Sequence, residues 1–301
     1  MIRRAAILGL ATASLWLGSA GGAPLSPHMQ PVARPIPDGY WLVAADGGVF
    51  SFGEASNHFH GSMGGARLAQ PVVGMAVTPS GDGYWLVASD GGVFSFGDAG
   101  FHGSMGATRL NQPVVGMAVT PSGDGYWLVA SDGGVFSFGD ASFHGALSGT
   151  HINGSVVGMA ATPSGNGYWL AASDGGVFSF GDATFHGSMA AANLNRPVVG
   201  MQATASGNGY WLVASDGGVF ALGDAPFLGS GSGVSAASVV GFSAPLWRDG
   251  YRLATSDGRA EAYSAPNMGD MAGQHLNSPI TGIASSPFYP WPPCPPNVAC
   301  G

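Results

Sequence analysis

Short apolar runs, separated by clusters of glycine, proline, aspartate and serine, fill most of this 301-residue chain. One unit contains four such runs, at residues 113–121, 125–130, 134–139 and 141–145, and each is rich in β-branched or aromatic residues. Runs of this length with turn residues at both ends are typical of β-strands. We therefore predict four short antiparallel strands, A to D, in each unit.

The unit repeats along the chain with a nearly constant period. The peptide Gly-Tyr-Trp-Leu, at the start of strand B, recurs after 44, 42, 42 and 42 residues, and a divergent sixth copy follows after 41. The copies begin at Gly39, Gly83, Gly125, Gly167, Gly209 and Gly250. Four short strands in about 40 residues is the size of a propeller blade, and a unit this small needs neighbours to bury its apolar side chains.

A tight hairpin is expected between strands B and C of every unit. The dipeptide Asp-Gly stands between these two runs six times, at Asp46, Asp90, Asp132, Asp174, Asp216 and Asp257. Asp-Gly between apolar runs is a strong hairpin signal, and we expect a type I′ turn with positive φ at both central residues.

The two ends of the array distinguish a closed propeller from an open solenoid. The first unit enters at strand B, because residues 31–38 are too short and proline-rich for a strand A, whereas residues 275–283 repeat the strand A sequence of 109–117. A final strand at 280–287 completes the first blade only in a closed ring. We therefore predict an all-β, six-bladed β-propeller over residues 39–287. Its repeats begin near residues 39, 71, 113, 156, 198 and 239.

Strand A carries a glycine in every unit, which agrees with a ring. These residues are Gly74, Gly116, Gly158, Gly200, Gly241 and Gly282. Innermost strands converge on the axis, where glycine permits close approach. The next residues are Met75, Met117, Met159, Met201, Phe242 and Ile283, and alternation with glycine favours packing between blades over a soft-metal site.

The stretch 129–140, Val-Ala-Ser-Asp-Gly-Gly-Val-Phe-Ser-Phe-Gly-Asp, together with Val-Val-Gly-Met-Ala at 114–118, resembles the repeat of the regulator-of-chromosome-condensation propellers. Secreted members of that family include a β-lactamase-inhibitory protein with short blades. The resemblance spans residues 39–287 and implies a propeller. This unit is shorter than the chromatin-type repeat, has Tyr-Trp where that family often has histidine, and gives six blades rather than the usual seven.

The N-terminus has the layout of a secretory signal peptide. Met1 to Arg4 is basic, residues 5–17 are apolar, and small residues up to Ala20 and Ala23 offer two cleavage points. An uncleaved anchor is the alternative interpretation. We expect a signal peptide at 1–23, a linker at 24–38 and a secreted protein, extracellular or associated with the cell wall, with no membrane span after cleavage.

Charge excludes one class of partner. The chain has no lysine and a net charge of −8, and removal of Arg3 and Arg4 leaves 7 arginines against 17 acidic residues, a net charge of −10. An acidic surface repels phosphate backbones, so nucleic acid is not an expected partner.

The tail at residues 288–301 is proline-rich and contains the only two cysteines of the chain. Cys294 and Cys300 are candidates for a disulfide after export to an oxidising compartment. Closing so short a loop contributes about 2 kcal/mol in the chain-entropy model, and it would stiffen the tail without fastening it to the propeller.

Two polar residue types recur with the blades. The peptide Phe-His-Gly contains His60, His102, His144 and His186, and Gly-Asp-Ala contains Asp98, Asp140, Asp182 and Asp224. One histidine per blade near the outer rim is too far from the next to share a metal ion, so we interpret these histidines as sources of a repeated hydrogen bond. The aspartates are interpreted as turn residues rather than calcium ligands. The sequence thus predicts no metal site and no cofactor.

Features that break the repeat are better candidates for recognition. The connections from strand D to strand A vary, and variable loops on a constant scaffold often bind partners, although neutral drift explains them equally well. The sixth unit departs most, with Arg248, Arg252 and Arg259 inside a charged 14-residue stretch. Arginine favours bidentate contacts with anions, so these three are candidate binding residues. A decayed repeat that acquired charges is the alternative.

Three kinds of function remain open. The first is a non-catalytic, monomeric binding module for an extracellular protein or cell-wall glycan. The second is an extracellular hydrolase or lyase with its site at the channel, and the third is a purely structural envelope protein. The sequence has no Gly-x-Ser-x-Gly or His-Glu-x-x-His motif, and strand A offers valine, glycine, methionine and alanine rather than acids and bases. We therefore favour the binding module.

Overall fold

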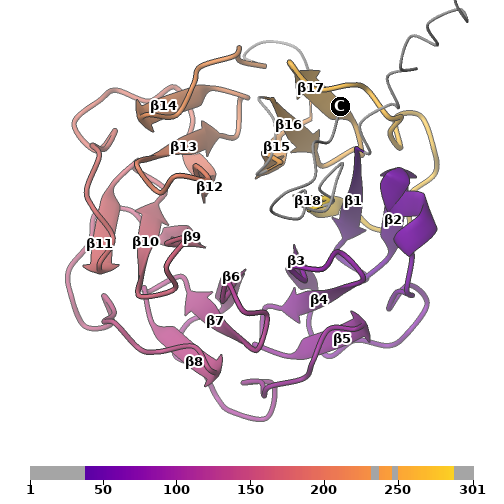
Figure 1. Ribbon diagram of the computed structural model, residues 1–301, viewed down its shortest axis with the longest axis horizontal. Helices are drawn as coiled ribbons and strands as arrows, with labels where there is room; N and C mark the ends of the chain where they lie inside the picture. The colour runs from indigo at the N-terminus through magenta and orange to yellow at the C-terminus, as the bar shows by residue number, and fades with distance from the viewer. Residues whose placement is uncertain (1–37, 232–236, 246–249, 288–301) are drawn as a thin grey trace, which may run out of the picture. The chain divides into compact units, whose positions relative to one another are not determined.

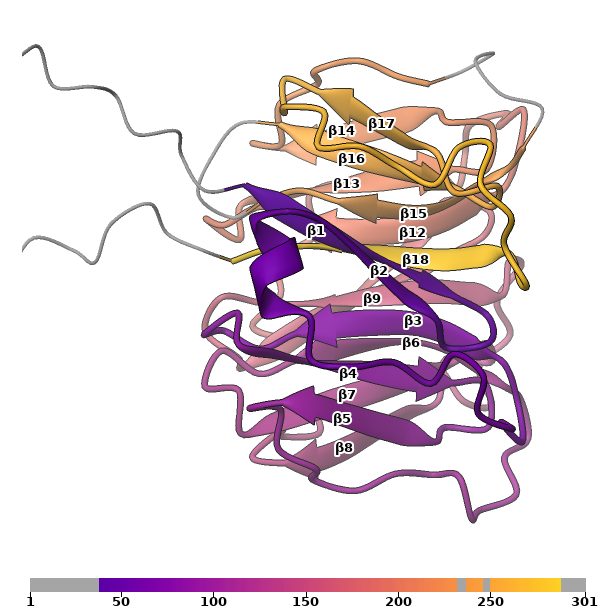
Figure 2. The ribbon, with the colours of Figure 1, turned by 90° about the vertical axis from the view of Figure 1, so that its right-hand side faces the viewer.

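The computed structural model describes residues 38–231, 237–245 and 250–287, and within these ranges its regular structure is almost entirely β-strand (Figure 1). Eighteen strands form six antiparallel sheets of three strands each, arranged as blades around a centre. One 3-10 helix, η1 (Glu54–His58), lies beside the first blade's strands (Figure 2). Nothing helical in the described ranges has the length and apolar character needed to span a bilayer.

Each blade has an inner, a middle and an outer strand, corresponding to the predicted strands A, B and C. The inner strands are β18 (Ile280–Ser285), β3 (Val72–Val77), β6 (Val114–Val119), β9 (Val156–Ala161), β12 (Val198–Ala203) and β15 (Val239–Ser243). The middle strands are β1 (Gly39–Ala44), β4 (Gly83–Ala88), β7 (Gly125–Ala130), β10 (Gly167–Ala172), β13 (Gly209–Ala214) and β16 (Tyr251–Thr255). The outer strands are β2 (Val49–Gly53), β5 (Val93–Gly97), β8 (Val135–Gly139), β11 (Val177–Gly181), β14 (Val219–Gly223) and β17 (Ala260–Tyr263).

The middle strand is buried on both faces, which explains why its sequence is continuously apolar. Side chains alternate between the two faces of a strand. In β4, Tyr84 and Leu86 join the hydrophobic cluster shared with the first blade, whereas Trp85 and Val87 join the cluster shared with the third. The same division recurs around the ring, so the core consists of six clusters, each between two neighbouring blades.

The ring closes as the sequence predicted. The sheet order β18-β1-β2 places the last strand of the repeat array beside the first, and Leu42 stands opposite Ile283 in this antiparallel pair. Each inner strand also donates its first backbone N–H to the carbonyl that follows the middle strand of the preceding blade. Val72 donates to Ala45 at 2.9 Å, and Ile280 completes the cycle by donating to Ser256 at 3.0 Å.

The strand A glycines lie where neighbouring inner strands approach closely. A Cβ on Gly116 would stand 3.8 Å from the Cα of Gly158, and a Cβ on Gly241 would stand 3.1 Å from the backbone nitrogen of Ile283. The predicted packing role of the methionines is also confirmed, because Met75, Met117 and Met201 pack against three of the interblade clusters.

The structure corrects the number of strands in each blade from four to three. The segment predicted as strand D follows the outer strand without joining its sheet. Its backbone is held by side chains instead: in the second blade, Trp85 Nε1 donates to the carbonyl of Gly100 at 2.7 Å. Further along, Tyr126 of the third blade donates its hydroxyl to Gly103 at 2.6 Å and accepts the N–H of His102 at 3.2 Å. The segment therefore crosses from one blade to the next.

The predicted type I′ hairpin is also wrong. In the first blade, Ala44 N–H donates to Gly48 and Gly47 N–H donates to Ala44, both at 2.8 Å, which defines a three-residue loop. Positive φ occurs at the glycine alone, between +77° and +91° across the six hairpins, and not at the aspartate. This is the type I turn followed by a left-handed glycine. The carboxylate of Asp46 accepts the N–H of Gly48 at 3.0 Å, which fixes the loop.

Candidate functional site

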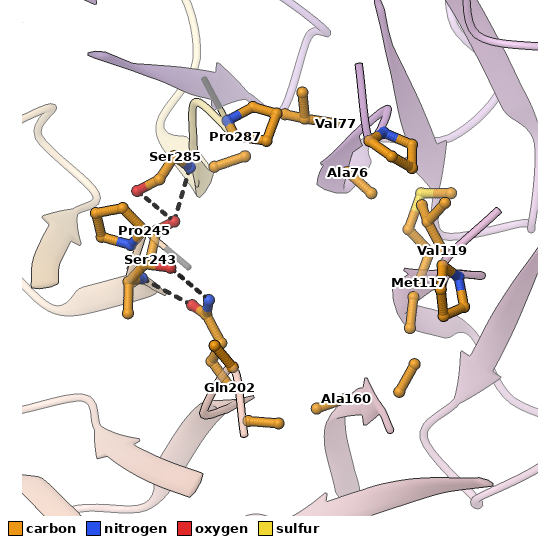
Figure 3. Close-up of a pocket in the computed structure, with 18 of the residues that line it drawn as sticks. Ala76, Val77, Met117, Val119, Ala160, Gln202, Ser243, Pro245, Ser285 and Pro287 are labelled. Atoms are coloured by element: carbon orange, nitrogen blue, oxygen red, sulfur yellow. Dashed lines mark hydrogen bonds between the residues drawn. The ribbon is translucent and has the colours of Figure 1, made fainter. Parts of the chain in front are cut away.

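The centre of the ring opens into a cavity of about 570 Å³, lined by the ends of the six inner strands and the residues after them. Its described lining consists of apolar and uncharged polar side chains. Figure 3 shows Ala76 and Ala160 on one side and Gln202, Ser243 and Ser285 on the other. This described part of the wall thus offers no pair of acidic or basic groups for proton transfer.

The polar side chains on one side of this cavity form hydrogen bonds between neighbouring blades. The amide of Gln202 donates to the carbonyl of Ala244 at 2.7 Å and accepts its N–H at 2.8 Å. Ser243 donates its hydroxyl to the hydroxyl of Ser285 at 2.8 Å and accepts the Ser285 N–H at 2.7 Å. These contacts join the fifth blade to the sixth and the sixth to the first. The sequence showed the signal, since Gln202 and Ser243 replace the alanine of the repeat.

The three candidate arginines do not form a surface cluster in the described part of the chain. Arg248 lies outside the described residues. Arg252, in β16, is fully buried, and its guanidinium contacts Asp38 at 2.6 Å and the carbonyl of Pro266 at 2.9 Å. Burial corrects the expectation that Arg252 lies on a binding surface. Arg259 follows the opposite end of β16, is half exposed and lies 3.3 Å from Asp257. Cys294 and Cys300 also lie outside the described residues.

The repeated aspartates bind the loop between inner and middle strands, a longer-range contact than the local turn that the sequence suggested. In the third blade, Thr120 donates to one oxygen of Asp140 at 2.8 Å and Ser122 to the other at 2.6 Å. The hydrogen bond from Ser122 is the main reason that the pKa of Asp140 is lowered. The same pair of bonds recurs at Asp98, Asp182 and Asp224.

The histidines after each outer strand contribute a repeated hydrogen bond, but through the backbone. The N–H of His144 donates to the hydroxyl of Tyr168 at 3.1 Å, and its ring packs edge-on against that tyrosine at 5.6 Å. His102 and His186 repeat the backbone bond and are also half-buried, whereas His60 is exposed.

A row of exposed phenylalanines on the outer rim was not predicted. These large apolar side chains lie in the crossing segments, where four of them precede a histidine and Phe227 precedes Leu228, and they are between 49% and 62% exposed. The set, called here the rim phenylalanines, comprises Phe59, Phe101, Phe143, Phe185 and Phe227. The signal was present in the Phe-His-Gly motif, but the motif alone could not show which of its two rings faces the core.

The crossing segment holds each rim phenylalanine from both sides in the middle blades. The carbonyl before Phe143 belongs to Ser142 and accepts the indole N–H of Trp127 at 2.7 Å. The N–H after it belongs to His144 and donates to Tyr168 at 3.1 Å. These two bonds fix the backbone around a side chain that projects outward, so the phenylalanine is presented from an ordered position.

Two solved structures resemble the ring and establish its class. The β-propeller domain of Cps50 (Swd1) from Myceliophteria thermophila matches with a TM-score of 0.52 at 12% sequence identity, covering 82% of this chain and 86% of that domain. A protein of unknown function from Bacteroides thetaiotaomicron matches with a TM-score of 0.51, also at 12% identity, covering 81% of this chain and 70% of its own. No family model and no curated protein sequence matches the chain. Together with the six three-stranded sheets, these likenesses show that the chain is a β-propeller.

Proposed function

We propose that this protein is a secreted, non-catalytic β-propeller that binds a partner protein at the cell envelope through its rim phenylalanines. One observation carries the proposal: five equivalent blades each expose a phenylalanine at the same position. A large apolar side chain exposed at the same position in five blades is a regular surface feature, and exposed apolar surface of this kind supports a role in binding.

The rim phenylalanines are suited to act as anchors. Full burial of one such ring contributes about 1.5–3 kcal/mol, so simultaneous burial of two or three supplies useful affinity. The hydrogen bonds at Ser142 and His144 order the backbone before binding. Such preorganisation reduces the entropy that is lost on association.

The chemistry of the rim favours protein over glycan. Phenylalanine is enriched at the core of protein interfaces, and its ring offers no hydrogen-bond donor or acceptor. The residue before it is Gly100, Ser142, Thr184 or Pro226 in four of the blades, so charged groups do not flank the ring on that side. Recognition of a sugar needs polar groups placed around an apolar ring, which makes glycan the second choice.

Export and envelope association belong to this proposal. They are supported by the signal-peptide layout of residues 1–23 and by a composition with only 9% charged residues and no lysine. The resemblance to regulator-of-chromosome-condensation repeats supports it as well, because secreted members of that family include an inhibitory protein that acts by binding another protein.

The proposal is tested by crosslinking purified protein to intact envelope fractions and identifying captured proteins. The key variant changes Phe101, Phe143 and Phe185 to serine. A matched control changes the equivalent exposed residues Asn111, Asn153 and Asn195 to alanine on the neighbouring connections. We expect the rim variant to lose a partner that wild type and control both retain.

Three outcomes would contradict the rim proposal. Equal capture of every protein by the rim variant would remove the phenylalanines from recognition, and loss in the control alone would move the site to the variable connections. Retention on deproteinised glycan by wild type but not by the rim variant would favour the second choice. A separate Arg248→Ala, Arg259→Ala variant tests the arginines that the sequence singled out.

A further inference from the structure

The first blade contains a two-residue insertion that the other blades lack. Between Gly53 and Phe59 the chain has five residues, whereas the second blade has three between Gly97 and Phe101. The insertion accounts for the 44-residue first period and forms η1. It places His58 immediately before the rim phenylalanine, where the other blades have Gly100, Ser142, Thr184 and Pro226.

His58 meets two other metal-ligating side chains at the junction with the second blade. Its Nδ1 lies 2.8 Å from Oδ1 of Asp82, which stands in the loop between β3 and β4. His60 completes the group, and the three ligand atoms all lie within 4.8 Å of one another. Two imidazoles and one carboxylate from two blades thus converge at the surface.

The other described junctions lack at least one member of this set. The second blade has His102, and the loop of the third has Asp124, but Gly100 stands where His58 would be. At the next two junctions the acidic position is Asn166 and then Asn208. The complete set is therefore a property of one site and not of the repeat.

The insertion has a structural cost. In the second blade Trp85 Nε1 donates to Gly100 at 2.7 Å, and the indoles of the next three blades make the equivalent bond. Trp41 Nε1 is buried and has no hydrogen-bond partner among the described residues. A lost bond to a buried donor costs about 1–3 kcal/mol. Fold stability therefore does not explain the insertion.

Neighbouring hydrogen bonds hold the three groups in place. The N–H of His60 donates to the hydroxyl of Tyr84 at 3.1 Å, and the N–H of Asp82 donates to the hydroxyl of Ser80, also at 3.1 Å. Asn57 donates to Glu54 at 3.0 Å within η1, upstream of His58. Fixed backbone on both blades lets short side-chain rotations complete a ligand set.

We propose that His58, His60 and Asp82 bind one divalent transition-metal ion, with zinc as the best match. Imidazole nitrogen with carboxylate oxygen is a ligand set for zinc and its neighbours, whereas calcium and magnesium prefer oxygen alone. Tetrahedral bonds of about 2.0–2.1 Å place ligand atoms about 3.3 Å apart, which the half-buried His58 and the exposed His60 and Asp82 reach by small rotations. Three protein ligands leave one position for water or for a group of a partner.

A metal ion at this position links the first blade to the second. His58 and His60 follow β2, whereas Asp82 precedes β4, so the ion bridges two blades through His58 and Asp82, which are 24 residues apart in the sequence. Binding to the folded ring alone raises its stability according to the ion concentration relative to the dissociation constant. Thermal stability is thus a second readout, independent of any partner protein.

The test uses untagged, metal-free protein titrated with zinc chloride by calorimetry, and with cobalt as a spectroscopic probe. We expect one tight site in wild type, weakened more than about 100-fold by His58→Ala and by Asp82→Asn, since loss of even an outer-shell partner costs up to about 100-fold. His102→Ala, at the equivalent position in the next blade, is the matched control and is expected to bind like wild type. Zinc is expected to raise the melting temperature of wild type and control only.

The two ligand variants lie on different segments, His58 in η1 and Asp82 in the loop before β4, so failure of one to fold does not remove the test. Equal zinc affinity in wild type and His58→Ala would overturn the proposal, as would equal loss in His102→Ala. Binding that is abolished only by substitution of His151 or His275 would assign the ion to an unrelated surface histidine. These results do not depend on whether the rim phenylalanines bind a partner.

Discussion

Asp38 and Arg252 form a buried ion pair across the closure of the ring. The Arg252 guanidinium lies 2.6 Å from the carboxylate, both side chains are 1% exposed, and the guanidinium stacks 5.0 Å from the ring centre of Tyr40. Arg252 occupies the position that tryptophan holds in the other blades, and Asp38 directly precedes the first strand. A charged pair thus supplements hydrophobic packing where the two ends of the array meet.

Removal of one partner of this pair is expected to destabilise the ring strongly. Asp38→Ala or Arg252→Ala leaves a buried charge without its counterion, which costs about 3–5 kcal/mol. Chemical denaturation measures the loss. The double variant Asp38→Leu, Arg252→Leu is expected to lose less than either single variant, and a double variant that loses the sum of both would contradict coupling between the two residues.

Deletion of residues 280–301 is expected to cost most of the stability of the domain, typically about 5–15 kcal/mol. The deletion removes β18, leaves β1 unpaired on one side and exposes the cluster that buries Ile280 and Ile283. Deletion of 288–301 alone is the control, because it keeps β18. Melting curves of the two truncated proteins compare them directly, and equal melting temperatures would refute closure by β18.

High pH is expected to weaken the fold through the tyrosines of the middle strands. Burial raises the pKa of Tyr40, Tyr84, Tyr126, Tyr168, Tyr210 and Tyr251. Burial also raises the pKa of Tyr263, to about 12. The folded ring keeps these protons where the unfolded chain, with a pKa near 10, releases them. Stability is therefore complete below about pH 10 and falls as pH rises further.

Denaturant titrations across this range, with phenolate absorbance followed in parallel, measure that loss. Ionisation of the tyrosines is expected to coincide with unfolding. Formation near pH 10 of more than one phenolate among the eight tyrosines of the chain, in a protein that keeps its circular dichroism, would contradict the effect of burial on these seven groups.

Two glycines that both have a positive φ differ in the space available to a Cβ atom. Gly139 and Gly149 have φ values of +67° and +80°. A Cβ on Gly139 would overlap the carbonyl oxygen of Asp124, whereas a Cβ on Gly149 would meet nothing within 4 Å. We expect Gly149→Ala to cost about 1–2 kcal/mol, the penalty of the left-handed region. Gly139→Ala is expected to cost about 3 kcal/mol or more, and equal costs would show that the backbone relaxes.

The repeat made the ring predictable, because periodic apolar runs determine both strand position and blade number. The same periodicity could not show on which face of its blade each side chain packs. The side chains of Trp85 and Tyr126, rather than a fourth strand, hold the crossing segment. Both residues belong to the repeat, but the repeat does not show which backbone groups they bind. The hairpin turn was missed because Asp-Gly also suits a type I turn followed by a left-handed glycine.

The candidate site was less predictable than the fold. Arg252 looked like a surface charge because its partner, Asp38, lies 214 residues away in the sequence. His58 was visible only as two extra residues in the first period, and its contact with Asp82 depends on how two blades meet. The rim phenylalanines repeat as regularly as the core, so repetition could not separate an exposed ring from a buried one.

The tyrosine hydroxyls join neighbouring blades by hydrogen bonds and so affect how the ring unfolds. Tyr84 holds Gly61 of the first blade, each later tyrosine holds the crossing segment of the blade before it, and Tyr40 holds Gly269 of the last. These hydrogen bonds join every blade to the next around the closed ring, so no blade forms a free end at which fraying can start. Loss of any one blade exposes the next, so unfolding and proteolysis of the described ring are expected to proceed all at once and not blade by blade.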